Sequence, residues 1–69
     1  MRIISQNGLL SINFEDCQLS VCHEAILYRS NYSHGSLGEY KTKERAMEVF
    51  NEIHDTWRDE YSLSVYEMP

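Results

Sequence analysis

Five side chains of this sequence are thiols or imidazoles, which can perform nucleophilic or metal chemistry. They are Cys17, Cys22, His23, His34 and His54. A thiol beside an imidazole can form a nucleophilic pair, and thiolates and imidazoles are common ligands of zinc. A structural zinc site needs four ligands in closely spaced pairs, but Cys17 and Cys22 form no CxxC motif and no second pair follows. No triad motif accompanies the cysteines, so we expect no metal, no cofactor and no enzymatic activity.

The segment from 33 to 38, SHGSLG, superficially resembles a phosphate-binding loop. In such loops, backbone N–H groups at the N-terminus of a helix hold the anion. Here the segment precedes an expected strand instead of a helix, so that anion-binding geometry is missing. We therefore interpret the stretch as an ordinary loop with turn-forming residues.

Carboxylates recur at helical spacing along the segment from 42 to 61. On a helix with about 100° per residue they fall within a stripe of roughly 80°. The stripe contains Glu44, Glu48, Glu52, Asp55 and Asp59. Carboxylates four residues apart repel each other by a few tenths of a kcal/mol, and Arg45 and Arg58 can offset part of this. The stripe is typical of a solvated helix face, and it also suits docking into a basic groove that binds nucleic acid.

The same segment has an apolar side, which predicts a helix packed on a core. This side consists of Ala46, Val49, Phe50, Ile53 and Trp57. These residues share a stripe of about 100°, on the side away from the carboxylates. Thr42 is suited to be the N-cap, because its hydroxyl oxygen can accept a hydrogen bond from a free N–H of the first turn.

The rest of the chain has the alternation and the turn residues of β-strands. Residues 2–14 are expected to form a hairpin, because Asn7-Gly8 is a strong turn signal, and that hairpin pairs Ile3 with Ile12. Residues 18–29 alternate like one strand. The residues of this strand expected to face the helix are Leu19, Val21, His23, Ala25 and Leu27.

Three further elements complete the expected fold. They are a loop over 30–36, a short strand over 37–41 and a final strand over 62–67. The prediction is a single α+β domain over residues 1–69, in which a small antiparallel or mixed sheet (β-β-β-β-α-β) packs one face against one amphipathic helix.

The expected core combines the inner face of this sheet with the apolar side of the helix. It comprises Ile3, Leu10, Ile12, Phe14, Leu19, Val21, Ala25, Leu27, Ala46, Val49, Phe50, Ile53, Trp57, Leu63 and Val65. A single helix covers one face only, and the residues of the other face are Ile4, Leu9, Ile26, Tyr28, Tyr40 and Tyr66. Because exposed aromatic patches usually mark interfaces, we expect Tyr28, Tyr40 and Tyr66 to bind a partner or to form a homo-oligomer.

The composition is that of a globular protein with an acidic surface. It is 42% hydrophobic and 25% charged, with a net charge of −5. This balance disfavours direct binding to nucleic acid or to an anionic membrane, since both need an excess of Lys and Arg. The sequence has no signal peptide and no apolar run of about 18 residues, and two cysteines are few for a disulfide scaffold. We therefore expect a cytoplasmic protein with reduced thiols.

Three stretches of the sequence form a distinctive combination: MRIISQNG, LGEYKTKERAMEVFNEIHDTW and YEMP. Together they resemble a group of small uncharacterised proteins of Firmicutes phages and prophages. In that group a similar hairpin leads to an LGxYxTxERAxEVxxEI helix entry and a YxMP-like tail. The segment from 57 to 64 departs from the pattern, because members of the group are often longer there. The resemblance implies a phage setting in the cytosol of a bacterial host, and it carries no catalytic or binding residues.

These observations lead to three functional hypotheses. The first is a non-enzymatic, phage-encoded protein that inhibits or sequesters a host factor, such as a defence protein with a basic groove. It would act through the carboxylate stripe or the tyrosines. The second is an oligomeric sponge for a small, nucleotide-like ligand, with polar contacts from Arg29, Tyr28, Tyr40 or Lys41. The third is an accessory of virion assembly, which predicts extensive self-association.

Overall fold

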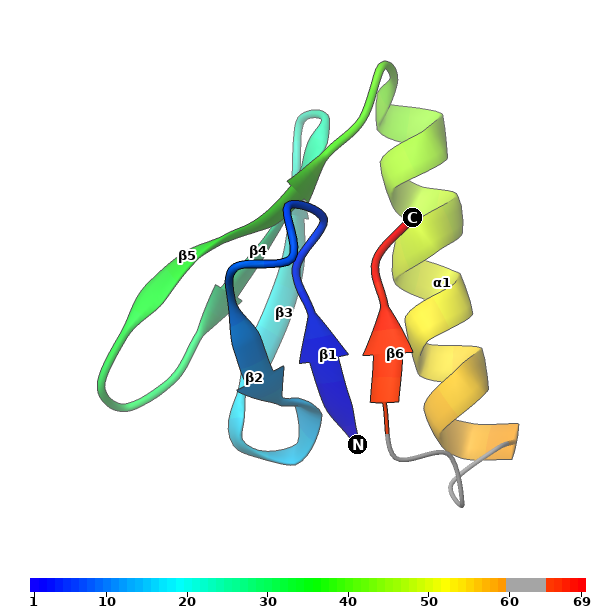
Figure 1. Cartoon of the computed structure of the whole chain (residues 1–69). Coiled ribbons are helices and arrows are strands. Elements are labelled where there is room, and N and C mark those ends of the chain that lie inside the picture. The colour runs from blue at the N-terminus through cyan, green and yellow to red at the C-terminus, as the bar shows by residue number, and fades with distance from the viewer. Residues whose placement is uncertain (60–64) are drawn as a thin grey trace.

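The computed structural model describes residues 1–59 and 65–69, and within these ranges it is an α+β fold of two small sheets and one α-helix (Figure 1). In chain order the elements are β1 (Arg2–Ile4), β2 (Ser11–Asn13), the 3-10 helix η1 (Phe14–Asp16), β3 (Gln18–Cys22), β4 (Ala25–Arg29), β5 (His34–Glu39), α1 (Lys43–Asp59) and β6 (Val65–Glu67). The predicted α+β class is confirmed, but the strands form two sheets where one was expected.

The first sheet has the order β2-β1-β6 and pairs strands from opposite ends of the sequence. β1 is antiparallel to β2 and parallel to β6, so Ile3 lies between Ile12 and Tyr66. The expected pairing of Ile3 with Ile12 is therefore confirmed. In the connecting turn the N–H of Gly8 donates to the carbonyl oxygen of Ser5 at 2.9 Å. Gly8 has a φ of +77°, which glycine adopts without the steric cost that a side chain would add.

The second sheet has the order β3-β4-β5 and is antiparallel throughout. The single strand predicted over residues 18–29 is wrong, because the chain reverses at His23 and Glu24. His23 has a φ of +55°, in the left-handed region that histidine enters more readily than most residues. It is exposed in this turn and does not face the helix as expected. Because Cys22 pairs with Ala25, each odd-numbered residue of β3 is paired with an even-numbered residue of β4. The side chains that face the core are therefore odd-numbered in β3 and even-numbered in β4.

Hydrogen bonds to Gln6 join the two sheets. Its backbone N–H donates to the carbonyl oxygen of Leu37 at 2.8 Å, and its side-chain oxygen accepts from the N–H of Glu39 at 2.9 Å. Both partners belong to β5, which begins at His34 and therefore earlier than the strand predicted over 37–41. The β1–β2 turn is thus attached to one edge of the second sheet.

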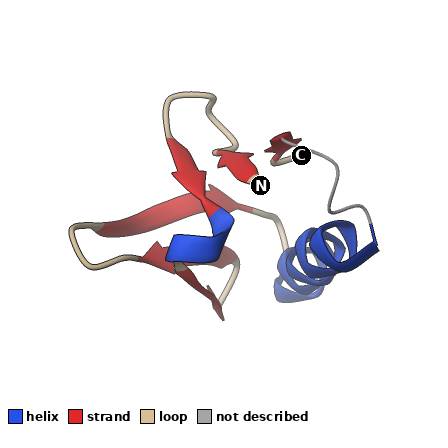
Figure 2. Ribbon diagram, turned by 90° about the horizontal axis from the view of Figure 1, so that it is seen from below, coloured by secondary structure: helices blue, strands red, loops and turns tan. Residues whose placement is uncertain are grey.

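α1 packs against β3 and β4 and lies to one side of the two sheets (Figure 2). The hydroxyl oxygen of Thr42 accepts from the N–H of Arg45 at 3.1 Å, so the predicted N-cap is confirmed. The fully buried residues of the helix are Ala46, Val49 and Ile53. Trp57, which was expected in the core, is 42% exposed in the last turns of α1. The predicted helical positions 60 and 61 lie outside the described residues.

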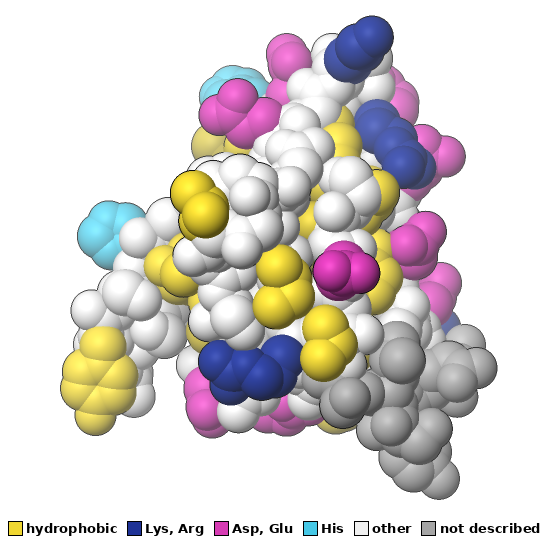
Figure 3. Space-filling view, viewed as in Figure 1, with side chains coloured by type: hydrophobic (Ala, Val, Ile, Leu, Met, Phe, Trp, Pro, Cys, Tyr) yellow, Lys and Arg dark blue, Asp and Glu magenta, His cyan; other side chains and the backbone are white. Residues whose placement is uncertain are grey.

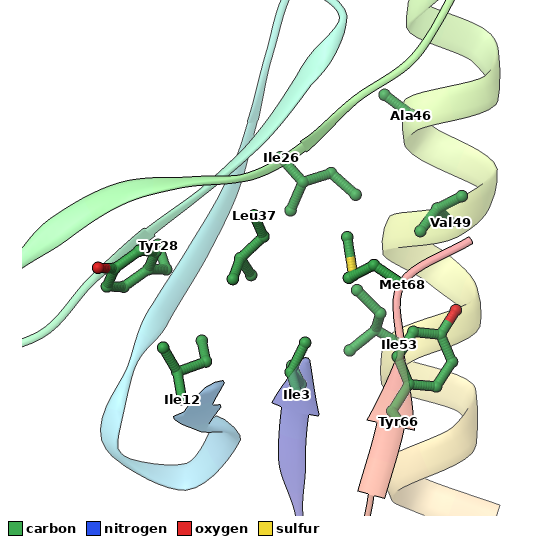
Figure 4. Packing of buried hydrophobic residues seen from close by; sticks show 10 residues of the cluster. All are labelled: Ile3, Ile12, Ile26, Tyr28, Leu37, Ala46, Val49, Ile53, Tyr66 and Met68. Carbon is green, nitrogen blue, oxygen red and sulfur yellow. The ribbon is translucent and has the colours of Figure 1, made fainter. Parts of the chain in front are cut away.

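The core fills the space between the second sheet on one side and β1, β6 and α1 on the other (Figure 4). Its buried members are Ile3, Ile12, Ile26, Tyr28, Leu37, Ala46, Val49, Ile53, Tyr66 and Met68. Sequence reasoning identified five of these correctly: Ile3, Ile12, Ala46, Val49 and Ile53. Ala25 and Leu27 are not in this cluster, because the reversal between β3 and β4 makes them face outward. Val65 is not in it either, because it pairs with Arg2 on the exposed side of the first sheet. The expected core residue Leu63 lies outside the described residues.

Candidate functional site

The outward side of α1 presents a row of exposed carboxylates. Its exposed carboxylates are Glu44, Glu48, Glu52 and Asp55, which we call the acidic helix face. Asp and Glu side chains line this side of the molecule in the space-filling view (Figure 3). The structure thus brings four of the five predicted acidic residues together, and the side chain of Asp59 lies outside its described part. This surface is convex, because the opposite side of the same helix is anchored in the core.

Two arginines of α1 neutralise this face only in part. Arg45 lies 3.8 Å from Glu48, and Arg58 lies 2.5 Å from Asp55, each pair spaced three residues apart on the helix. All four side chains are well exposed, so water and salt screen these pairs and each contributes well under about 1 kcal/mol. The acidic helix face therefore keeps a negative potential that a basic partner can sense.

Glu52 differs from the other carboxylates of this face because it also binds within the fold. The hydroxyl of Tyr66 in β6 donates to Oε1 of Glu52 at 2.6 Å. This charge-assisted bond fastens α1 to the first sheet. Burial raises the pKa of Tyr66 well above its usual range, and the bond to the Glu52 carboxylate adds to the shift. Tyr66 is therefore a fixed hydrogen-bond donor. Glu52 stabilises the fold by accepting this bond, and it also belongs to the acidic helix face.

The predicted tyrosine-bearing surface is wrong, because its tyrosines lie mostly inside the protein. Tyr28 is 7% exposed and Tyr66 is 8% exposed, both in the core. Tyr40 is half-buried, and its hydroxyl oxygen is buried without a hydrogen-bond partner. Burial also raises the pKa of Tyr40. For Tyr28 the cause of the error is the turn at His23, which reverses the alternation on which the assignment of faces in residues 18–29 depended.

An aromatic corner at the end of α1 was missed in the sequence. It consists of Phe14, Phe50, His54 and Trp57, with ring centroids 4.5 to 5.6 Å apart. Nε1 of Trp57 donates to Oε2 of Glu15 at 2.7 Å, and the Met1 amino group donates to the same carboxylate at 2.9 Å. These hydrogen bonds, chiefly the one from the amino group, lower the pKa of Glu15. The corner joins η1 to the helix, a contact between distant segments that local patterns do not encode.

The cysteines and histidines occupy separate places. His34 lies in β5, and the imidazole of His54 donates from Nδ1 to the carbonyl oxygen of Phe50 at 2.8 Å. Cys22 is exposed and Cys17 is half-buried, and burial raises the pKa of the Cys17 thiol, which opposes formation of a reactive thiolate. Among the residues that the structure describes, no three His, Cys, Asp or Glu side chains are grouped as a metal ion would require.

The outer face of the second sheet contains an open hollow of about 460 Å³, which we call the sheet hollow. It is lined by Gln18, Ser20, Leu27, Tyr28, Arg29, His34, Gly35 and Ser36. Of the four polar residues expected to serve a ligand sponge, Arg29 and Tyr28 line the hollow, whereas Tyr40 and Lys41 do not. Arg29 lies beside His34 at one end of the sheet, whereas Tyr40 and Lys41 follow β5 at the other end.

Comparisons with known proteins add no functional assignment. No protein-family model, curated protein or solved structure matches this chain at a significant level. Within the described ranges, no helix is both long enough and apolar enough to cross a membrane.

Proposed function

We propose that this protein is a non-enzymatic binding protein whose acidic helix face docks onto a basic surface of a partner protein. The observation that supports the proposal is the row of exposed carboxylates from Glu44 to Asp55 on a helix whose opposite side is buried in the core. In the phage setting that the sequence resemblance implies, the partner is a host factor that is inhibited or sequestered. The homo-oligomer expected from the tyrosines is not proposed again, because Tyr28 and Tyr66 are buried.

The geometry of the acidic helix face suits a groove that normally holds nucleic acid. At about 1.5 Å rise per residue, Glu44 and Asp55 are separated by roughly 17 Å along the helix axis. A row of negative charges of this length can occupy several phosphate-binding positions of a basic groove. Complementary charge would raise the association rate and favour this class of partner over others, more than it would add affinity.

The test compares charge reversals on two faces of the molecule. The helix variant is E44K/E48K/D55K, which spares Glu52 because that residue holds Tyr66. The matched control is E24K/E39K/E67K, whose three carboxylates are exposed on other elements. Each triple replacement changes the net charge from −5 to +1, since each position gains two charges. The native chain and the two variants are immobilised and exposed to the lysate of a Firmicute at two salt concentrations.

We expect a basic protein to be retained stoichiometrically by the native chain and by the control, and to be lost by the helix variant. Binding to that purified partner should weaken by tenfold or more as salt rises from about 0.05 to 0.2 M, because exposed charges are screened over a Debye length of about 10 Å. Circular dichroism of all three proteins checks that the fold is intact. If the helix variant retains the partner, or if both triples lose it equally, the proposal is wrong.

A further inference from the structure

The sheet hollow gathers hydrogen-bond donors from three neighbouring strands. Gln18 of β3 pairs with Arg29 of β4, and Arg29 pairs with His34 of β5, so these side chains form one row across the outer face. The next row along the strands consists of Ser20, Leu27 and Ser36. Both rows line the hollow. A guanidinium, an amide, an imidazole and two hydroxyls thus converge on one opening.

The charge of this hollow is opposite to that of the molecule. The chain has 11 acidic and 6 basic residues, yet no Asp or Glu lines the hollow. Glu39 is the nearest acidic residue along β5, and it pairs with Ala25, two rows away from Arg29. The side chain of Arg29 is exposed and forms no ion pair or hydrogen bond with any other residue of the described ranges. Its five donors are directed to solvent or to a ligand.

An irregularity in the sheet lies beside the hollow. The register of β4 and β5 shifts between Ile26 and Leu27, where the pairing passes from Gly38 to Ser36 and leaves Leu37 without a partner. A bulge of this kind bends the strand and increases its local twist. Leu27, half-buried between the two serines, gives the hollow an apolar floor.

We propose that the sheet hollow binds the phosphate group of a small phosphorylated molecule. A carboxylate offers two oxygens, whereas a phosphate offers three or four to the guanidinium, amide, imidazole and hydroxyl donors present. A volume of about 460 Å³ exceeds what phosphate alone needs and lies in the usual range of small-molecule sites. The organic part of the ligand contacts Leu27. Side chains hold the anion here, so no helix N-terminus is required.

This site is separate from the acidic helix face, and it goes beyond the protein-binding function proposed above. The two faces belong to different elements, and no residue is shared between them. Loss of one activity should therefore leave the other intact. The E44K/E48K/D55K variant, which tests the helix, should still bind phosphate.

The test is a titration followed by amide chemical shifts of the ¹⁵N-labelled protein at constant ionic strength. The probes are inorganic phosphate, adenosine 5′-monophosphate and acetate. Phosphate should shift the amides around Gln18, Arg29 and His34, and the nucleotide should bind more tightly than phosphate if a phosphate ester is the ligand. Equal affinities would identify free phosphate as the ligand. The variant R29Q should weaken phosphate binding by about tenfold, because it removes the charge-assisted bonds.

The matched control is R2Q, which removes an exposed arginine from β1 and should leave the affinity unchanged. The amide spectrum of each variant shows directly whether it is folded. The proposal is overturned if phosphate at concentrations up to about 20 mM causes no chemical-shift changes at the sheet hollow, because the dissociation constant would then be too large for specific binding. It is also overturned if R29Q and R2Q bind alike, or if acetate binds as well as phosphate.

Discussion

The outward side of α1 and the outer face of the β3-β4-β5 sheet are both exposed, but they differ in charge and in shape. The helix side presents exposed carboxylates on a convex surface. The sheet face forms a hollow lined by donors, with no carboxylate in its lining. A chain with a net charge of −5 therefore contains one surface suited to a cationic partner and another suited to an anionic ligand.

The difference shows that net charge does not describe the binding properties of a small domain. In each element, the residues that face the core determine which residues are left on the surface. The core takes Ala46, Val49 and Ile53 from α1, which leaves the carboxylates outside. It takes Ile26 and Tyr28 from β4, and the residues left outside are then Leu27 and Arg29.

The largest effect should come from exchanging buried and outward residues of β4. Ile26 is fully buried, so Ile26→Ala should lower the free energy of unfolding by about 2–5 kcal/mol. Leu27 faces outward and is half-buried, so Leu27→Ala should cost less than about 1 kcal/mol. Urea unfolding followed by Trp57 fluorescence measures both values. A domain of this size has only about 3–5 kcal/mol to lose, so Ile26→Val, at about 0.5–1.5 kcal/mol, keeps the first measurement within range.

The reverse order, with Leu27→Ala more costly than Ile26→Ala, would show that Leu27 faces the core and Ile26 faces outward. The sheet hollow would then not exist. Leu27→Ala also separates the two surfaces. It should weaken the binding of a nucleoside monophosphate at the sheet hollow, and it should leave the binding of a partner protein to the acidic helix face unchanged.

An intermediate effect separates Glu52 from the rest of the acidic helix face. Tyr66→Phe removes the hydroxyl that donates to Glu52, and it should cost about 1.5–3 kcal/mol, as for other hydrogen bonds to charged groups. Tyr40→Phe removes a buried hydroxyl that has no partner, so it should be neutral or stabilising. Thermal unfolding of the two variants gives the comparison. Equal destabilisation would mean that the bond to Glu52 contributes nothing.

The same pair of tyrosines sets a dependence on alkaline pH. The pKa of Tyr66 is raised in the folded protein above its ordinary value of 10, chiefly by burial. A raised folded-state pKa gives stability that is complete below pH 10 and is lost as the pH rises further. Unfolding measured from pH 9 to 11.5 should therefore show a steeper loss for the native chain than for Tyr66→Phe. Tyr40→Phe should also flatten the curve, since burial raises the pKa of Tyr40 as well.

Sequence patterns predicted the helix and its acidic face because a period of 3.6 residues persists without interruption from Thr42 to Trp57. The sheet face was not predicted, since its pattern changes phase at a turn that contains neither Gly, Asn nor Pro. An assignment based on alternation alone carries the wrong parity through every later residue of such a strand. That is why Tyr28 was placed outside, and why the donors around Arg29 were not recognised as one surface.

The smallest predicted effect concerns the turn that determines this parity. At His23, where φ is +55°, Gly should be more stable than Ala by about 1 kcal/mol, because only a side chain with a Cβ is strained in the left-handed region. At the next position, Glu24, φ is negative, and Ala should be more stable than Gly by about 0.5–1 kcal/mol. The four single variants are compared by urea unfolding. Both turn positions are exposed, so packing contributes little to either difference. The opposite signs at adjacent positions are specific to a hairpin between β3 and β4, since a continuous strand over residues 18–29 would favour Ala at both.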